Sequence, residues 1–522
     1  MRTLELPRSL RLSRNPLVTL GLWVIVIFAA YKVAEAILAN DLSSLAYAGI
    51  LFLAGAVIVA ILNDWRRGLY FLVAWILFED LVRKFLGNNM AIYFAKDVLT
   101  IILYFSFFKA QRAKRVQTFR VPFRIPLLLF IWFGLLQVFN PASTSIFYGI
   151  LGMKVYFLYV PLIFVGYALL QSEADLQRFF SFNCILILAV AGLGFVQSIV
   201  GPTFLAPPTL QEDIRELGTL YRTAPISGAI AYRPTSVFVS AGRFQDFLIV
   251  SWLISLGYSG YLLLRSRRGR VLAFITVGIV GAASLMSASR GVFMWNSGIA
   301  LVVVAGFLWG APWRQGEALR MVRTIQRVTL AVGLGTVILV TFFPEELGSR
   351  MAIYTETLLP NSSASELVHR TQVYPLQQLG YAFSYPRWPY GYGIGTCTLG
   401  IQYVTRIMHA TPMYIGVEGG FANLIVELGI VGLVLWVVLG FAISFSAWKV
   451  VCELKGTPWF PISFVIFLFS FLLFFPMTYV GTSYEDFLVN IYLWLLLGML
   501  YRQRMISKAA QLLHQQAIRR EG

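Results

Sequence analysis

Long runs of apolar residues recur along this chain, and they constrain its fold more than any other feature. A helix that crosses the hydrocarbon core of a bilayer needs about 20 mostly apolar residues. Of the 522 residues, 58% are hydrophobic and only 13% are charged, whereas a soluble protein carries about 25% charged residues. This composition excludes a soluble enzyme, a disordered chain and a fibrous protein, and it predicts an all-α, polytopic membrane protein with one integral membrane domain over residues 1–522. The runs predict about fourteen transmembrane helices, at residues 17–39, 42–62, 68–86, 91–108, 125–140, 154–170, 179–200, 244–264, 271–288, 291–310, 328–343, 420–443, 460–480 and 486–501.

The basic residues predict on which side of the membrane each loop lies. The net charge is +18, from 42 Lys and Arg against 24 Asp and Glu. In a soluble chain that balance would suggest a nucleic-acid partner, but the cytoplasmic loops of membrane proteins retain Lys and Arg. With the N-terminus inside, alternating spans place about two thirds of the basic residues in cytoplasmic segments. The pattern predicts a multi-pass protein of the bacterial inner membrane with both termini in the cytoplasm, and no nucleic-acid partner.

Two predicted periplasmic loops are long and rich in proline and glycine, at residues 201–243 and 344–419. Long ordered loops on a membrane scaffold are usually functional. Within the second loop, residues 364–383 carry apolar side chains at near-helical spacing, which predicts a surface helix that kinks or begins at Pro375. We therefore expect the active site in the loop at 344–419.

Arginine dominates the basic residues that remain outside the cytoplasmic segments. Arg is better suited than Lys to bidentate contact with phosphate or carboxylate oxygens, so the pattern favours an outward-facing site for an anionic, phosphate-bearing ligand. The alternative is that these arginines pair with loop carboxylates and hold the loops together. The basic residues concerned are Lys32, Arg83, Lys84, Lys96, Lys154, Arg215, Arg222, Arg233, Arg243, Arg290, Arg350, Arg370, Arg387 and Arg406. The carboxylates are those of Glu212, Asp213, Glu216, Glu345, Glu346, Glu356 and Glu366.

Two of these basic residues stand at predicted membrane boundaries. Arg290 lies between two apolar runs with no acidic residue nearby in the sequence, and such an arginine is either a functional residue or one that extends to the headgroups. Lys154, at the outer start of a span, is a candidate phosphate contact or an interface anchor. Charged residues inside predicted spans should pair across helices or form a proton or ion pathway. They are Glu79, Asp80, Lys96 and Asp97.

The sequence shows no pattern that would hold a metal or a nucleotide. The only histidines are His369, His409 and His514, and no carboxylate pair or His/Cys cluster has metal-ligand spacing on the outer face. The glycines of GYGIGT at 391–396 follow no strand of a βαβ unit, so they do not predict a nucleotide site. We therefore expect no metal and no cofactor.

Several segments resemble the bacterial O-antigen ligase and O-antigen polymerase superfamily, over roughly residues 220–445. GYGIGT is similar to the family's Gly-rich turn, and MYIGVEGGFANLIVELGIVGLVLW at 413–436 is similar to the region that leads into a span beginning Glu-Leu-Gly-x-x-Gly. SASRGVF resembles the family's Ser-Arg-Gly hairpin and places Arg290 on a family arginine. YRPTSVFVSAGRFQDFL at 232–248 resembles its Arg-led segment and places Arg233 on a second. Arg370, at the start of the surface helix, looks like a third.

One position departs from the family pattern. Nine residues before Glu427, where the family has His, this chain has Glu418, and His409 lies nine residues further upstream. The resemblance thus implies either a carboxylate base at Glu418 or a role for His409. Glu427 is interpreted as a structural residue that orients the loop.

The resemblance implies a periplasmic-face glycosyltransferase of the O-antigen ligase or polymerase type. It would move a glycan from an undecaprenyl-diphosphate carrier onto a growing glycan, a lipid-A core or another acceptor, without metal, while embedded in the lipid bilayer. Arg290 would stabilise the charge of the diphosphate leaving group, and Glu418 or His409 would accept the proton of the acceptor. Arg233, Arg370, Lys154 and Arg243 are the expected substrate contacts.

Two other hypotheses remain open. A transporter or exporter of a small anion or envelope precursor would use the charged residues of the spans, although no internal repeat typical of transporters is evident. A scaffold of an envelope assembly would explain the apolar runs but not the arginine bias.

Overall fold

The structure is a computed structural model of the chain, and it describes residues 55–86, 90–205, 220–265, 269–312, 341–359, 362–363, 365–398, 401, 404–405 and 416–521. The predicted span at 17–39, and most of those at 42–62 and 328–343, lie outside the described residues. The chain divides into two compact units, one of Met1–Trp75 and Phe94–Val116, the other of Ile76–Tyr93 and Gln117–Gly522. The second unit carries the candidate site.

Helices make up most of the described chain, as the apolar runs predict. They are α3 (Trp65–Phe85), α4 (Met90–Arg112), α5 (Arg124–Val138), α6 (Ile146–Phe157), α7 (Leu162–Leu169), α8 (Glu173–Val200), α10 (Ala241–Leu264), α11 (Arg270–Met286), α12 (Arg290–Gly310), α14 (Pro344–Leu358), α15 (Tyr374–Ser384), α17 (Gly420–Glu453), α18 (Phe460–Leu472), α19 (Thr478–Val480) and α20 (Phe487–Glu521), with π-helical turns η3 (His369–Val373) and η4 (Leu473–Met477) and a 3-10 turn η5 (Ser483–Glu485).

Seven helices among the described residues are long and apolar enough to cross a membrane. The predicted spans at 125–140 and 271–288 correspond to α5 and α11, which are apolar but shorter. The seven are Ala91–Arg112, Ile146–Leu169, Glu173–Val200, Ala241–Leu264, Arg290–Gly310, Gly420–Glu453 and Phe460–Val480.

Several helix boundaries differ from the predicted spans because local capping decides them. The span predicted at 154–170 begins instead at Ile146, where the Ser145 side chain accepts a hydrogen bond from the Phe147 amide at 3.3 Å. Similarly, α8 begins at Glu173, ahead of the predicted residue 179, because Ser172 and Asp175 form a reciprocal capping box. Polar capping residues lie outside an apolar run, so hydropathy alone cannot place them.

The helices of the second unit pack closely where glycines face backbone. A Cβ added to Gly166 of α7 would lie 2.0 Å from the Leu495 carbonyl of α20, and one on Gly498 would lie 2.0 Å from the Ile163 carbonyl. Small residues allow such close approach between membrane helices. These contacts fix α7 against α20.

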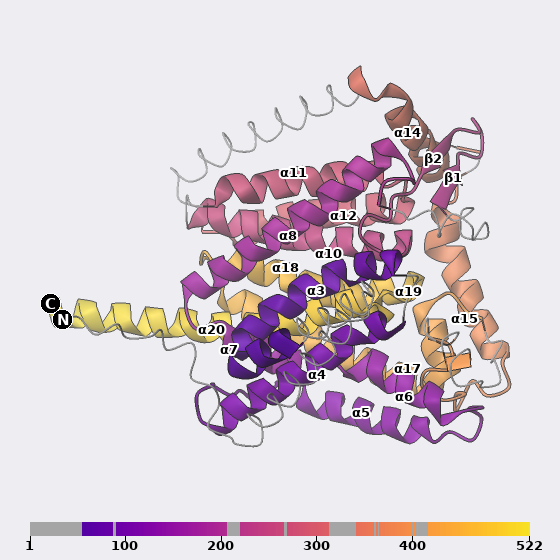
Figure 1. The fold of residues 1–522 in the computed structure, drawn as a ribbon. Helices are drawn as coiled ribbons and strands as arrows, with labels where there is room; N and C mark the ends of the chain where they lie inside the picture. Colours follow the sequence, from indigo (N-terminus) through magenta and orange to yellow (C-terminus); the bar gives the residue numbers. More distant parts are fainter. Residues whose placement is uncertain are drawn as a thin grey trace, which may run out of the picture. The chain divides into compact units, whose positions relative to one another are not determined.

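The two long loops contain regular structure at one end of α8, α10, α11 and α12, where α14, β1, β2 and α15 gather (Figure 1). The surface helix predicted at 364–383 is confirmed as η3 followed by α15, with Pro375 in the first turn of α15. The all-α prediction is correct for the bulk of the described chain but misses a hairpin. Strands β1 (Tyr221–Thr223) and β2 (Ile230–Tyr232) pair antiparallel, with Arg222 opposite Ala231.

Candidate functional site

Arg290 begins α12 and has an acidic partner that is distant in the sequence. Ser289 caps the helix by accepting a hydrogen bond from the Val292 amide at 3.4 Å. The Arg290 Nη1 atom lies 2.8 Å from Glu366 Oε2, and the Arg290 side chain is 15% exposed. The residue is therefore paired with a loop carboxylate.

Glu366 draws together further arginines. Arg370, one helical turn later, brings its Nε atom to 3.4 Å from Glu366 Oε2. Burial, followed by the positive charges of Arg290 and Arg233, lowers the pKa of Arg222 to about 10. Burial and then the charge of Arg290 also lower the pKa of Arg233. Mutual repulsion of this kind requires the guanidinium groups to be close.

We call Arg222, Arg233, Arg290 and Arg370 the arginine cluster. Partial burial acts to raise the pKa of Glu366, but its hydrogen bond with Arg290 and the charge of Arg290 hold that pKa below its usual range. One ionised carboxylate thus pairs with Arg290 and Arg370 and acts on Arg222, while Arg233 lies close to Arg290. The cluster keeps an excess of positive charge that suits a ligand with more than one negative charge.

The hairpin that presents Arg222 rests on a small apolar core. Ala224, Ala231, Ala288, Ile353 and Tyr354 are buried together there. The Tyr354 hydroxyl donates to the Leu285 carbonyl at 2.9 Å, which ties α14 to the end of α11 just before the Arg290 turn. The core therefore places the hairpin beside the start of α12.

Arg350 and Glu356 of α14 fix the same region by contacts with backbone. Arg350 is buried and donates to the carbonyls of Met286 at 2.8 Å and Ser198 at 2.7 Å. The Glu356 carboxylate accepts from the Ile226 amide at 2.7 Å, at the tip of the hairpin. Because its guanidinium is committed to carbonyl groups, Arg350 positions the site and is not available to a ligand.

Glu418 joins the cluster through one tyrosine. The Tyr374 hydroxyl donates to Glu418 Oε2, and the Arg370 guanidinium lies 5.1 Å from the centre of the Tyr374 ring. Burial, followed by the hydrogen bond to Glu418, raises the pKa of Tyr374 to about 12. Gln378 accepts a hydrogen bond from the Glu418 amide at 2.9 Å. His409 lies outside the described residues.

The Gly-rich turn is held by Glu427, as expected of a structural residue. Its Oε1 atom accepts from the Cys397 amide at 2.8 Å, and its Oε2 atom from the Tyr156 hydroxyl at 3.0 Å. Gly391 has φ +77°, and a Cβ there would lie 2.4 Å from the Glu427 carbonyl. Only glycine fits this close approach of turn and helix. The interpretation of Glu427 as an orienting residue is confirmed.

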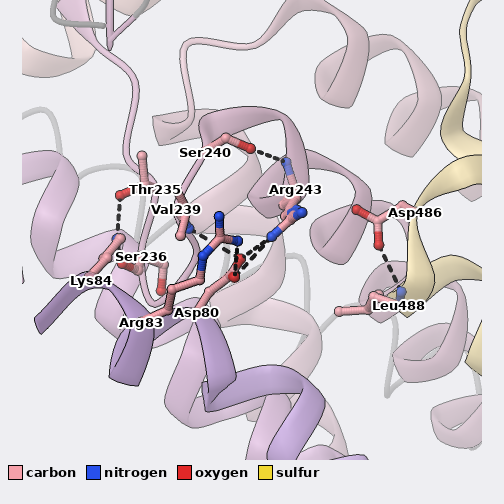
Figure 2. A network of polar contacts seen from close by, with 10 residues as sticks. All are labelled: Asp80, Arg83, Lys84, Thr235, Ser236, Val239, Ser240, Arg243, Asp486 and Leu488. Carbon is pink, nitrogen blue, oxygen red and sulfur yellow. Dashed lines mark hydrogen bonds and ion pairs between the residues drawn. The ribbon is translucent and has the colours of Figure 1, made fainter. Parts of the chain in front are cut away.

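Arg243 lies in a different, buried network (Figure 2). Its Nη1 atom lies 2.9 and 2.7 Å from the two carboxylate oxygens of Asp80, and Arg83 lies 3.6 Å from the same group. Figure 2 also shows Lys84, which donates to the Thr235 hydroxyl at 2.9 Å and to the Ser236 carbonyl at 2.7 Å. The network anchors the segment between Arg233 and α10, and it confirms that Asp80 pairs across helices.

Lys154 lies beside the same network. Its Nζ atom is 4.4 Å from the centre of the Tyr93 ring, which also lies 5.2 Å from the Arg83 guanidinium and 5.8 Å from that of Arg243. The structure therefore divides the predicted contacts into two sets. Around Glu366 and Tyr374 lie Arg233, Arg290, Arg370 and Glu418. Around Asp80 and Tyr93 lie Arg243 and Lys154.

Three members of the site carry little local signal in the sequence. In the sequence Arg222 is one of many arginines, and the short segments YRT and IAY on either side of Pro225 and Gly228 are the local signal for a hairpin. The sequence predicts Glu366 only as one of several loop carboxylates, and no local pattern indicates a role for Tyr374. Over the ranges that the structure describes, no group of three or more His, Cys, Asp or Glu residues could hold a metal ion.

A comparison with protein-family models and with curated proteins gives no match for this chain. The class that the fold itself defines is a mostly helical protein with several helices of membrane-spanning length.

Proposed function

We propose that this protein is a membrane-embedded glycosyltransferase that moves a glycan from an undecaprenyl-diphosphate carrier onto a glycan or lipid acceptor, on the periplasmic side of the bacterial inner membrane. The observation that carries the proposal is the arginine cluster around Glu366. Two guanidinium groups pair with one carboxylate, two more arginines lie close by, and clustered arginines are well suited to bind phosphate oxygens. The sequence resemblance to O-antigen ligases and polymerases points in the same direction.

In the proposed reaction, an acceptor hydroxyl attacks the anomeric carbon of the donor glycan. The bond between that carbon and the diphosphate oxygen breaks, and undecaprenyl diphosphate leaves with the bonding electron pair. Guanidinium groups that are already in place stabilise this developing charge better than water, which must reorganise. Arg290 is the central contact, because it lies at the start of α12 and is mostly buried. The diphosphate oxygens would replace the Glu366 carboxylate on Arg290.

The acceptor's proton would pass to Glu418. This carboxylate is exposed, so an acceptor hydroxyl can approach it, and the Tyr374 hydroxyl fixes one of its oxygens. Tyr374 is in turn held by Arg370. The base and the proposed diphosphate contacts are therefore linked through Arg370 and Tyr374, which lie four residues apart in the continuous run of η3 and α15. Tyr374 is proposed as a positioning residue.

The test uses the full chain in liposomes with a defined undecaprenyl-diphosphate-linked glycan and an acceptor glycan. Arg290→Ala should lower the rate of glycan transfer about 10²- to 10³-fold, the usual loss when one charge-stabilising donor is removed. Arg290→Lys should keep part of the wild-type rate, because the positive charge remains. Arg265→Ala is the matched control, since that arginine pairs with Glu173 away from the cluster. Normal glycan length and amount from correctly inserted Arg290→Ala protein would refute the proposal.

A second candidate function, a transporter of a small anion or an envelope precursor, is favoured by one observation. In the ion pair between Arg243 and Asp80 the carboxylate is buried among helices and the arginine is half-buried. Such charges are typical of transport pathways in membrane proteins. This function would be favoured if a labelled anion enters protein-containing liposomes and if the Asp80→Asn variant loses that flux. Product formation without flux would favour the transferase.

A further inference from the structure

An exposed apolar surface continues from the helix that carries Tyr374. One face of α15 is buried, with Pro375, Gln378 and Ala382 turned inward. On one flank of that helix, Leu376 and Phe383 are 59% and 43% exposed. Apolar surface of this kind marks an interaction site when it is contiguous.

The surface extends past the end of α15. The Trp388 ring packs edge-on against Phe383, with ring centres 5.3 Å apart. Tyr390 follows and is 77% exposed. We call Leu376, Phe383, Trp388 and Tyr390 the aromatic stripe.

Backbone hydrogen bonds fix the position of the stripe along α17 and α5. The Trp388 carbonyl accepts from the Ile430 amide at 3.2 Å. The Tyr390 carbonyl accepts from the Gln137 side chain at 3.0 Å, near the end of α5. Ile430 directly follows Gly429, where α17 departs from helical geometry with φ +70°. The stripe therefore lies level with the kink of α17.

The length of α17 relates this level to the depth of a bilayer. From Ile430 to Glu453 the helix rises about 35 Å at 1.5 Å per residue, and a hydrocarbon core is about 30 Å thick. Glu453 lies 2.6 Å from Arg504 and 2.9 Å from Lys508, and such a charged cluster belongs in water. Ile430 and the stripe beside it then lie at the opposite edge of the hydrocarbon core.

Large apolar side chains of α17 become exposed at the same level. Beyond Ile430, α17 exposes a row of large apolar residues along its length, and Phe139 at the end of α5 is 69% exposed. Trp and Tyr concentrate where hydrocarbon meets headgroups, because their rings are apolar and their tips are polar. The exposed row consists of Val431, Val434, Val438, Phe441 and Phe445.

We propose that the aromatic stripe inserts into the lipid headgroup boundary of the leaflet at the site end, so that α15 lies along the membrane surface. The occupant is the bilayer itself, because the stripe is continuous with the exposed apolar row of α17. Since η3 runs directly into α15, Arg370 and Tyr374 are held close to the depth of lipid phosphates. The candidate site then opens at the membrane surface.

The test measures depth with spin labels in the full chain reconstituted in phosphatidylcholine vesicles. Phe383→Cys and Tyr390→Cys are labelled in a Cys452→Ser background, which removes the exposed native cysteine. Gln377→Cys is the matched control, an exposed polar position on the other flank of α15. For each label, the relaxation enhancement caused by oxygen, which enriches in lipid, is compared with the enhancement caused by a water-soluble nickel chelate.

Labels at 383 and 390 should favour oxygen over nickel, whereas the label at 377 should favour nickel. Leu376→Cys gives a second reading of the stripe if either aromatic variant fails to insert. Equal nickel accessibility at stripe positions and at 377 would overturn the proposal. Because no step of the measurement depends on glycan transfer, its outcome is independent of the proposed reaction.

Discussion

Arg290 and Glu366 form an ion pair of 2.8 Å between the first residue of α12 and the segment just before η3. The pair links two parts of the chain that are far apart in sequence. Glu366 also contacts Arg370 and thus occupies the centre of the arginine cluster. A carboxylate in this place competes with any anionic ligand for the same guanidinium groups.

Replacing Glu366 with Gln should therefore strengthen the binding of inorganic pyrophosphate. The charged hydrogen bond with Arg290 is worth roughly 1.5–3 kcal/mol, so its loss should tighten binding by at least about tenfold. Titration calorimetry on detergent-solubilised protein measures the change. Glu173→Gln removes a comparable pair with Arg265 outside the cluster and should leave binding unchanged. Weaker binding in Glu366→Gln would show that this carboxylate supports the cluster and does not compete with the ligand.

The same carboxylate predicts a pH dependence of stability. The folded-state pKa of Glu366 is depressed from 4.5, so its ion pair stabilises the folded protein above that pH. Stability is then lost as the pH falls through the lower, folded-state pKa, because the unfolded carboxyl binds its proton first. The melting temperature of the wild type should fall more steeply below pH 4.5 than that of Glu366→Gln. Parallel profiles for the two proteins would argue against this pair as a contributor.

Substitution in the Gly-rich turn should disturb the fold more than substitution in the neighbouring helix. Gly391→Ala places a Cβ 2.4 Å from the Glu427 carbonyl at a φ of +77°. The left-handed conformation alone costs a non-glycine residue about 1–2 kcal/mol, and the backbone contact adds to it. Gly380→Ala in α15 meets no atom within 4 Å and should stabilise the helix by about 0.5–1 kcal/mol. Melting temperatures of the purified variants test whether Gly391→Ala lowers stability and Gly380→Ala raises it.

The sequence predicts the helices well because hydropathy and length are properties of each segment alone. The surface helix at 364–383 follows from the spacing of its apolar residues and from Pro375. The prediction that Arg233, Arg290 and Arg370 lie in outer segments rests on counting charges on each side. Each of these inferences depends on local chemistry and on the cost of placing charge in lipid.

The partners of those arginines depend on tertiary contacts and could not be predicted. Nothing near Arg290 in the sequence indicates Glu366, since packing of the hairpin and α14 brings the two segments together. Arg243 resembles the other outer arginines in sequence, but it pairs with Asp80 of α3. A row of similar residues therefore divides into ligand candidates and structural anchors only when the contacts are known.

The identity of the base is decided by comparing Glu418 with His409. If Glu418 accepts the acceptor's proton, Glu418→Gln should lower kcat by about 10²- to 10⁴-fold with little change in KM for the donor, because the arginine cluster is intact. Tyr374→Phe should cause a smaller loss, since the carboxylate remains but one of its oxygens is no longer held. His409→Ala should then keep most of the activity. Single-turnover rates with a defined lipid-linked donor separate the three variants, and a loss in His409→Ala with normal turnover in Glu418→Gln would assign the base to the histidine.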